Sequence, residues 1–191
     1  MLKTYVAADL KLFDKAAARK IHKTVEDYND FIINNINKVV DKNDFVVLLG
    51  EISVGSTIST LNYLSKINSK IQILDEHFGK IFKETTKDEI PIDMSFVGLG
   101  HISLGEDFSI YIPNSKVDYD LKKELLSDFV NLRIAAPNSY INSDKLYNNR
   151  ILNISLEEWG YEPIELGERL PQIIDDMEIF SKMKTTEEVI S

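Results

Sequence analysis

The sequence predicts an α/β fold in which parallel strands alternate with helices. Two observations support this class. Short apolar runs of β-prone residues recur along the chain, and the stretches between them carry apolar residues at helical spacing. Parallel neighbours need a crossover segment, which such helices supply. A chain of 191 residues fits one domain with a single layered core.

Three strands are expected in the first half. Lys3 to Ala8 is a β-prone run, and Lys70 to Leu74 is a similar one. The run from Phe45 to Leu49 is apolar throughout, which is typical of a central strand covered on both faces.

Two amphipathic segments supply the crossovers. Apolar residues recur at helical spacing from Lys15 to Val40, with Asp14 placed as an N-cap, so one long helix is expected there. A second helix is expected from Ser56 to Ile67, with the hydroxyl of Ser56 as its cap. Its inner face should carry Ile58, Leu61, Leu64 and Ile67.

The second half does not alternate strictly and predicts an α+β arrangement. The expected strands are Ile92 to Leu99, Phe108 to Ile112 and Arg150 to Ser155, and the expected helices are Asp118 to Val130 and Glu168 to Met183. No linker or repeat interrupts the chain. A single domain over residues 1–183 is therefore expected, followed by a tail over residues 184–191.

Composition narrows the classes of function. The formal net charge of -9 and the isoelectric point near 4.9 argue against nucleic acid as a ligand, because the chain repels a phosphate backbone. Cysteine is absent, so any metal must bind Asp, Glu, His or Asn. The chain shows neither a signal-peptide pattern nor an apolar run of the roughly 18 residues that span a membrane. We expect a cytoplasmic protein without membrane contact.

Acidic residues directly follow the first three strands. Asp9 follows the first, Gly50-Glu51 follows the second, and Asp75-Glu76-His77 follows the third. Because the carboxyl ends of parallel strands meet at one edge of a sheet, these side chains should lie close together. They form a candidate metal or ligand site.

These motifs resemble those of the calcineurin-like metallophosphoesterases, especially the small stand-alone members of bacteria and phages. The family's first strand ends in Asp-x-His, and here Asp9 is kept while Lys11 replaces the His. Its second strand ends in Gly-Asp, which here is Gly50-Glu51. Its third motif is Gly-Asn-His followed by Asp or Glu. The matching stretch, Asp75-Glu76-His77-Phe78, keeps only the His.

The resemblance continues through the rest of the chain. Val97 to Leu104 is similar to the family's strand that ends in a lone His, here His101. Leu132 to Pro137 stands where the family has Gly-His-x-His, and it contains no metal ligand. Arg150 to Leu166 resembles the closing strand and its aromatic-x-Pro-x-x-Leu ending. The resemblance implies a four-layer αββα sandwich with mixed sheets.

The family's chemistry needs two metal ions about 3.5–4 Å apart, which clamp the phosphoryl oxygens and activate water. The matching positions do not supply that set, so no metal or other cofactor is expected; these positions are Asp9, Lys11, Glu51, Glu76 and His101. If a metal such as Mn²⁺ binds, its ligands are Asp9, Glu51 and His101. Lys11 is expected to pair with Asp9 or Glu51 and so to take the place of the lost ligand.

The favoured interpretation is a catalytically inactive phosphoesterase-fold protein. It would bind a protein partner as a regulator or as a structural subunit of a larger assembly. Frequent Lys, Asn and Ile indicate an AT-rich genome, and hence a low-GC bacterium or its phage, so that assembly could be a virion. One alternative is a weak or single-metal phosphodiesterase or phosphatase, to which the resemblance gives His77 as a vestigial catalytic acid. The other is a binder of a small phosphorylated ligand, held by Lys11 and Arg133.

Simpler roles account for some of the same residues. Asp9 and Glu51 could cap the helices that follow them. Trp159 is expected to pack beside the closing strand. Two segments are candidate interaction surfaces, from Tyr111 to Val130 and from Glu168 to Ile190.

Overall fold

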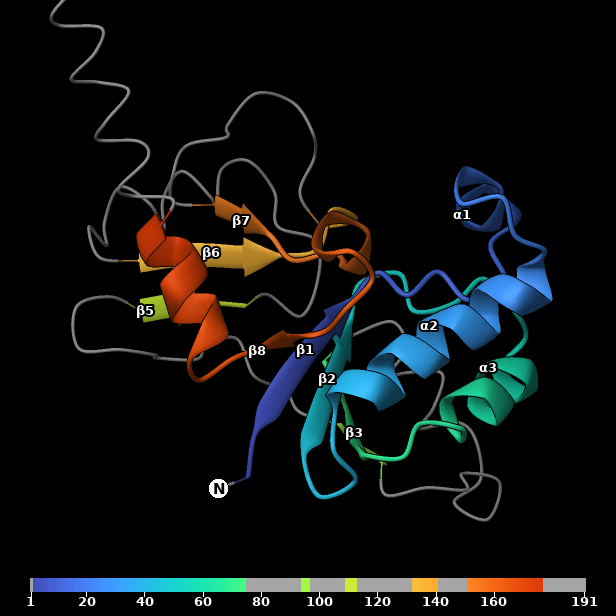
Figure 1. The fold of residues 1–191 in the computed structure, drawn as a ribbon, viewed down its shortest axis with the longest axis horizontal. Helices are drawn as coiled ribbons and strands as arrows, with labels where there is room; N and C mark the ends of the chain where they lie inside the picture. The colour runs from blue at the N-terminus through green and yellow to red at the C-terminus, as the bar shows by residue number, and fades with distance from the viewer. Residues whose placement is uncertain (1, 75–93, 97–108, 113–131, 141–150, 177–191) are drawn as a thin grey trace, which may run out of the picture.

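The computed structural model describes residues 2–74, 94–96, 109–112, 132–140 and 151–176. Within them the chain forms a mixed α/β fold with one larger and one smaller sheet (Figure 1). The α/β class predicted from the sequence is confirmed. Among the described helices, none is both long and apolar enough to cross a membrane.

The larger sheet has five strands in the order β4-β3-β2-β1-β8. Four strands run parallel, and the last pairs antiparallel with β1; they are β1 (Thr4–Ala8), β2 (Phe45–Leu49), β3 (Lys70–Ile73), β4 (Met94–Phe96) and β8 (Ile164–Glu165). The first three strands therefore lie where the sequence predicts them, each within one residue at either end.

The smaller sheet has three parallel strands, β5 (Ser109–Tyr111), β6 (Leu132–Ala136) and β7 (Ile151–Asn153). β5 and β7 lie inside two of the predicted strands, and β4 lies inside a third. The helix expected from Asp118 to Val130 and the tail over residues 184–191 lie outside the described residues.

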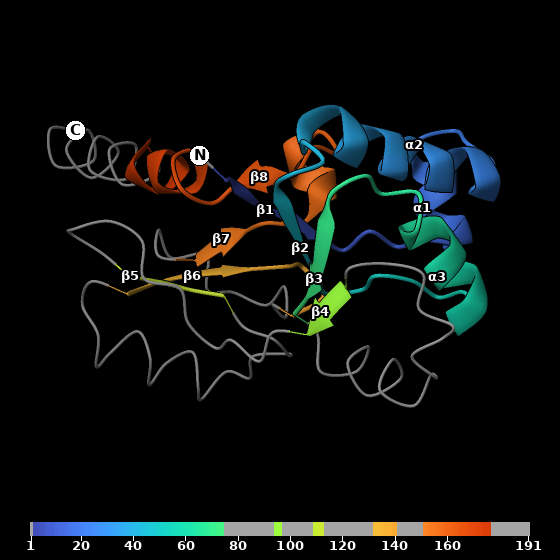
Figure 2. The ribbon, with the colours of Figure 1, turned by 90° about the horizontal axis from the view of Figure 1, so that it is seen from below.

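The two sheets and three of the described helices form layers around two apolar cores. The helices are α1 (Lys15–Lys20), α2 (Val25–Val39) and α3 (Thr57–Leu64). They cover one face of the larger sheet, and the smaller sheet lies toward the other face (Figures 1 and 2). Side chains alternate along β1 and β2, so Tyr5 and Val46 enter the helix-side core while Val6 and Val47 enter the core shared with the smaller sheet. This two-sided burial explains why β2 is apolar throughout.

The segment predicted as one long helix forms two. α1 ends at Lys20, and His22 takes a left-handed backbone conformation with φ of 56°. Thr24 then caps α2, because its hydroxyl oxygen accepts a hydrogen bond from the N–H of Asp27 at 3.1 Å. The prediction of one helix was wrong. The apolar spacing continues across the break and gave no sign of it, but the cap at Thr24 starts a second helix.

Both predicted caps are confirmed, but one predicted core residue is not. Asp14 accepts from the N–H of Ala16 at 2.6 Å at the start of α1, and Ser56 accepts from Ser59 at 3.2 Å at the start of α3. Ile58, expected on the inner face of α3, is 70% exposed. The buried residues of α3 are Thr60, Leu61 and Leu64, and the middle of that face lies roughly 110° around the helix from Ile58.

Glu165 joins the larger sheet to the helical residues 169–176, which lie inside the predicted C-terminal helix. Its carboxylate accepts three backbone hydrogen bonds, from Gly167 at 2.9 Å, Glu168 at 2.7 Å and Arg169 at 3.1 Å. Partial burial alone would raise the pKa of Glu165, but these three N–H groups and Lys3 together lower that pKa below its ordinary value of 4.5.

Replacing Glu165 with Gln should lower the free energy of unfolding at neutral pH by about 1 kcal/mol, because an amide oxygen is a weaker acceptor and solvent screens the site. The folded-state pKa lies below the unfolded one. The carboxylate's contribution is therefore present above a pH of about 4.5 and is lost as the pH falls through the folded-state pKa. Urea denaturation at pH 7 and near pH 3 should show the difference between wild type and variant shrinking at acid pH. A constant difference would contradict this assignment.

Candidate functional site

The carboxyl ends of β1 and β2 lie beside the ends of β6 and β7. Ala8 at the end of β1 pairs with Leu49 of β2 and also bridges Ser155, just after β7. Asp9 comes next in the chain, and only 4% of it is exposed. Its backbone is left-handed, with φ of 53°, and its N–H donates to the carbonyl of Leu49 at 3.0 Å. The first candidate residue therefore lies buried where the two sheets meet.

Four hydrogen bonds converge on the carboxylate of Asp9. Oδ1 accepts from the backbone N–H of Glu51 at 2.9 Å and from the hydroxyl of Ser139 at 2.5 Å. Oδ2 accepts from the N–H of Ser139 at 3.1 Å and from the hydroxyl of Ser155 at 2.7 Å. A carboxylate offers about four lone-pair positions. The protein's own donors fill them. We call Asp9, Ser139 and Ser155 the Asp9 cluster.

A second set of hydrogen bonds fixes the partners of Asp9. The hydroxyl oxygen of Ser155 accepts from the N–H of Asn138 at 2.7 Å. The backbone N–H of Ser155 donates to the side-chain oxygen of Asn153 at 3.0 Å. The hydroxyl oxygen of Tyr140 accepts from the N–H of Gly50 at 3.1 Å. These bonds connect the segments after β2, β6 and β7 that supply the donors to Asp9.

Gly50 is required by the space around Asp9. Its φ of 76° is left-handed, and it is buried. A Cβ at this position would collide with Oδ1 of Asp9 and would lie 2.9 Å from Cβ of Pro137. The glycine of the Gly50-Glu51 pair therefore allows β2 to approach both β1 and the turn after β6.

The Asp9 cluster does not fit a divalent metal ion. A metal binds carboxylate lone pairs, and here every such position faces a hydroxyl or an N–H group. Those donors point their hydrogens toward the place that a cation would occupy. Across the described ranges, no group of three or more His, Asp or Glu side chains is placed to hold a metal.

We expected Lys11 to pair with a carboxylate and so to take the place of a metal ligand, but it does not. Its backbone N–H donates to the carbonyl of Glu51 at 2.8 Å, which brings the two residues together. Ion pairs within the described part of the chain nevertheless join other residues, and none joins Lys11 to Asp9 or Glu51. The expected pairing is wrong because neutral donors already satisfy Asp9. The side chain of Glu51 is exposed.

Other predicted site residues cannot be placed in this cluster. Glu76, His77 and His101 lie outside the described residues. Arg133 lies in β6, in register with Ile110 of β5, and its side chain is outside the description. Away from this edge, Trp159 packs as expected: its ring N–H donates to the carbonyl of Asn153 at 2.8 Å, and it contacts the core shared by the two sheets.

Sequence reasoning missed three residues of the site: Ser139, Tyr140 and Ser155. Ser155 ends a predicted strand, in the same way that Asp9 follows one. Ser139 and Tyr140 lie in the turn after β6, where the search for histidine ligands found none. A search for polar side chains at predicted strand ends would have found Ser155. Ser139 and Tyr140 lie three and four residues after the end of β6, and no strand-end pattern singles them out.

Comparison with known proteins gives the fold alone. No family model matches the chain, and no curated protein matches it significantly. A crystal structure of a protein of unknown function from Aquifex aeolicus is similar, with a TM-score of 0.61 and 14% sequence identity. The match covers 93% of this chain and 100% of that one. The likeness extends over almost the whole chain but carries no functional information.

Replacing Asp9 with Asn should destabilise the protein by about 3 kcal/mol, because buried hydroxyl and N–H donors then lack their acceptor. Glu51→Gln removes the same charge from an exposed side chain and should change stability by less than about 0.5 kcal/mol. Chemical denaturation of both variants checks the pair. Equal stability of the two variants would show that the Asp9 cluster contributes nothing to the fold.

Proposed function

We propose that this chain is a catalytically inactive protein of the calcineurin-like metallophosphoesterase type, and that it works by binding another protein. The saturated carboxylate of Asp9 carries the proposal. In the family that the sequence resembles, the corresponding Asp holds metal. Here its oxygens accept hydrogen bonds from serine hydroxyls and backbone N–H groups, so the residue serves the fold.

The arrangement of the described elements supports a four-layer αββα sandwich. The two sheets share one apolar core, and α1, α2 and α3 pack on the outer face of the larger sheet. The helix predicted from Asp118 to Val130 would supply the fourth layer. The antiparallel pairing of β8 with β1 makes the larger sheet mixed, as the resemblance implies.

Substitutions at other positions support the loss of catalysis. Lys11 stands where the family has a His, and its ammonium repels a divalent cation. Ala135 and Pro137 fall in the stretch that corresponds to the late histidine motif, and both are buried. A two-metal centre needs several of these ligands at once. The described part of the site does not provide them.

Exposed apolar residues support a role in protein binding. Val54 is 66% exposed and Ile58 is 70% exposed. Both lie in the segment directly after Glu51, at the edge where Asp9 is buried. Large exposed apolar side chains in one short segment are candidates for an interaction surface. This segment is therefore our candidate contact.

Binding of a small phosphorylated ligand is a second candidate, which Lys11 favours. Its ammonium forms no ion pair with any described residue, so it is free to contact a phosphate. Glu51 accepts a backbone hydrogen bond from Lys11, and its exposed carboxylate would repel an anion bound at the same place. We rank this function below protein binding for that reason.

Purified protein from cells supplied with Mn²⁺ should contain far less than one metal ion per chain and should hydrolyse bis-p-nitrophenyl phosphate no faster than Mn²⁺ alone, since Asp9 has no free acceptor. Elemental analysis and a colorimetric assay measure the two quantities. Glu51→Gln is the matched variant, because it removes an exposed carboxylate without disturbing Asp9. Manganese-dependent turnover that Glu51→Gln abolishes would overturn the proposal in favour of a single-metal phosphodiesterase.

Ile58→Asp should reduce the amount of partner captured from an extract of the source cells by about tenfold or more, because a charge enters an apolar contact. Its melting temperature should not change, since the side chain is exposed. Asn34→Asp adds the same charge to an exposed position on α2 and should capture as much as wild type. Equal capture by the two variants, or no captured partner at all, would count against a contact at this edge.

A further inference from the structure

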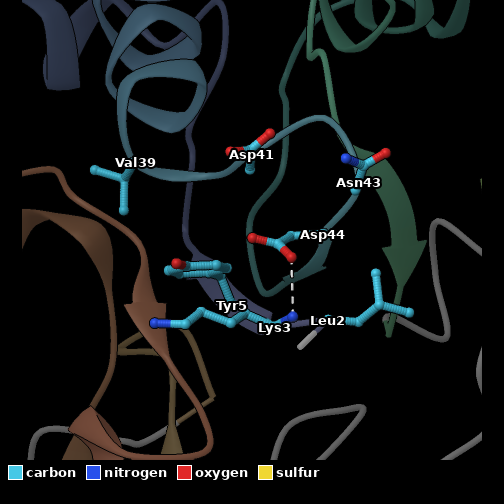
Figure 3. A pocket seen from close by; sticks show the side chains of 7 residues that line it. All are labelled: Leu2, Lys3, Tyr5, Val39, Asp41, Asn43 and Asp44. Carbon is cyan, nitrogen blue, oxygen red and sulfur yellow. Dashed lines mark hydrogen bonds between the residues drawn. The ribbon is translucent and has the colours of Figure 1, made fainter.

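A hollow of about 680 Å³ opens near the amino-terminal ends of β1 and β2, whereas Asp9 lies at their carboxyl ends (Figure 3). It lies between the start of β1 and the loop that joins α2 to β2. Its volume is within the range of about 300–1,000 Å³ that is usual for ligand sites. The hollow lies about one strand length from the Asp9 cluster, so whatever it binds is independent of metal binding at Asp9.

Apolar and aromatic groups form part of the wall. Tyr5 is only 9% exposed and turns its ring toward the hollow, and Val39 at the end of α2 lies across from it (Figure 3). Leu2 lies at the rim and is 64% exposed. These groups can cover the carbon atoms of a long side chain while its polar end reaches deeper.

Asp44 is a largely buried residue whose carboxylate lacks a full set of donors from the described part of the protein. It is 8% exposed, and its Oδ1 accepts from the backbone N–H of Lys3 at 2.9 Å. Its other oxygen accepts no hydrogen bond from any described residue and points into the hollow (Figure 3). Solvent reaches this oxygen. An N–H group of a ligand can therefore reach it as well and form a charge-assisted hydrogen bond there.

The charge around the hollow favours a cation. Asp41 lines it beside Asp44, and neither carboxylate belongs to an ion pair among the described residues. The side chain of Lys3 runs below Tyr5 and away from Asp44 (Figure 3). Burial raises the pKa of the Tyr5 hydroxyl, and Asp44, Glu165 and Asp41 raise it further against the opposing effect of Lys3. Carboxylates thus outnumber the ammonium group around this ring.

We infer that the hollow binds the guanidinium group of an arginine side chain presented by a partner protein. The planar guanidinium would donate to the free oxygen of Asp44 and to Asp41, and would lie against the ring of Tyr5. The arginine methylenes would contact Val39 and Leu2. The chain's net charge of -9 attracts a basic partner from a distance.

Titration of the full-length, ¹⁵N-labelled protein with N-acetyl-arginine amide tests this inference. Chemical shifts should move at the amides of Lys3, Tyr5, Asn43 and Asp44, with a millimolar dissociation constant. N-acetyl-citrulline amide has the same shape without the charge, and it should bind about tenfold more weakly or not at all. Equal binding of the two compounds, or shifts confined to other parts of the chain, would overturn the inference.

Two variants separate a site from general attraction by an acidic protein. Asp41→Asn should weaken binding of the arginine compound about fivefold. Glu26→Gln removes the same charge from an exposed position in the first turn of α2, at the other end of that helix, and should bind as wild type does. If both variants weaken binding equally, the attraction is non-specific and the hollow is not the site.

Discussion

The hydrogen bonds to the carboxylate of Asp9 are the interaction on which the junction of the two sheets depends. Asp9 follows β1 of the larger sheet, whereas Ser139 and Ser155 follow β6 and β7 of the smaller one. Apolar packing between the sheets is non-directional and would tolerate a slip. Hydrogen bonds to a buried carboxylate are directional and costly to break. They fix the position at which the strand ends meet.

The first half of the fold could be predicted from the sequence because its patterns are local. The apolar run of β2 and the caps at Asp14 and Ser56 each lie within a few residues of the element that they define. The break between α1 and α2 was also local, but its signal was a cap and not a gap in the apolar pattern. Thr24, followed three residues later by Asp27, indicated a new helix start.

The site could be predicted only in part, because its contacts are long-range. Asp9 was found from its place after a strand. Its partners Ser139 and Ser155 lie 130 and 146 residues further along the chain, and no spacing rule connects them to Asp9. The expectation of a Lys11 ion pair rested on its charge and on its place in the resembled motif. Hydroxyl and backbone N–H donors, which carry no formal charge, satisfied the carboxylate instead. The carboxylates at the two ends of the strands also differ in their hydrogen bonds, since Asp9 has a full set of donors and Asp44 does not.

The shared carboxylate also constrains how this protein can evolve. Ser139 and Ser155 both use Asp9 as their acceptor, so a substitution at any one of the three changes what is tolerated at the other two. A chain that freed Asp9 for another role by single steps would pass through forms with buried donors left unpaired, which are less stable. The cluster therefore acts as an epistatic block. Related sequences should keep the three residues together or replace them together.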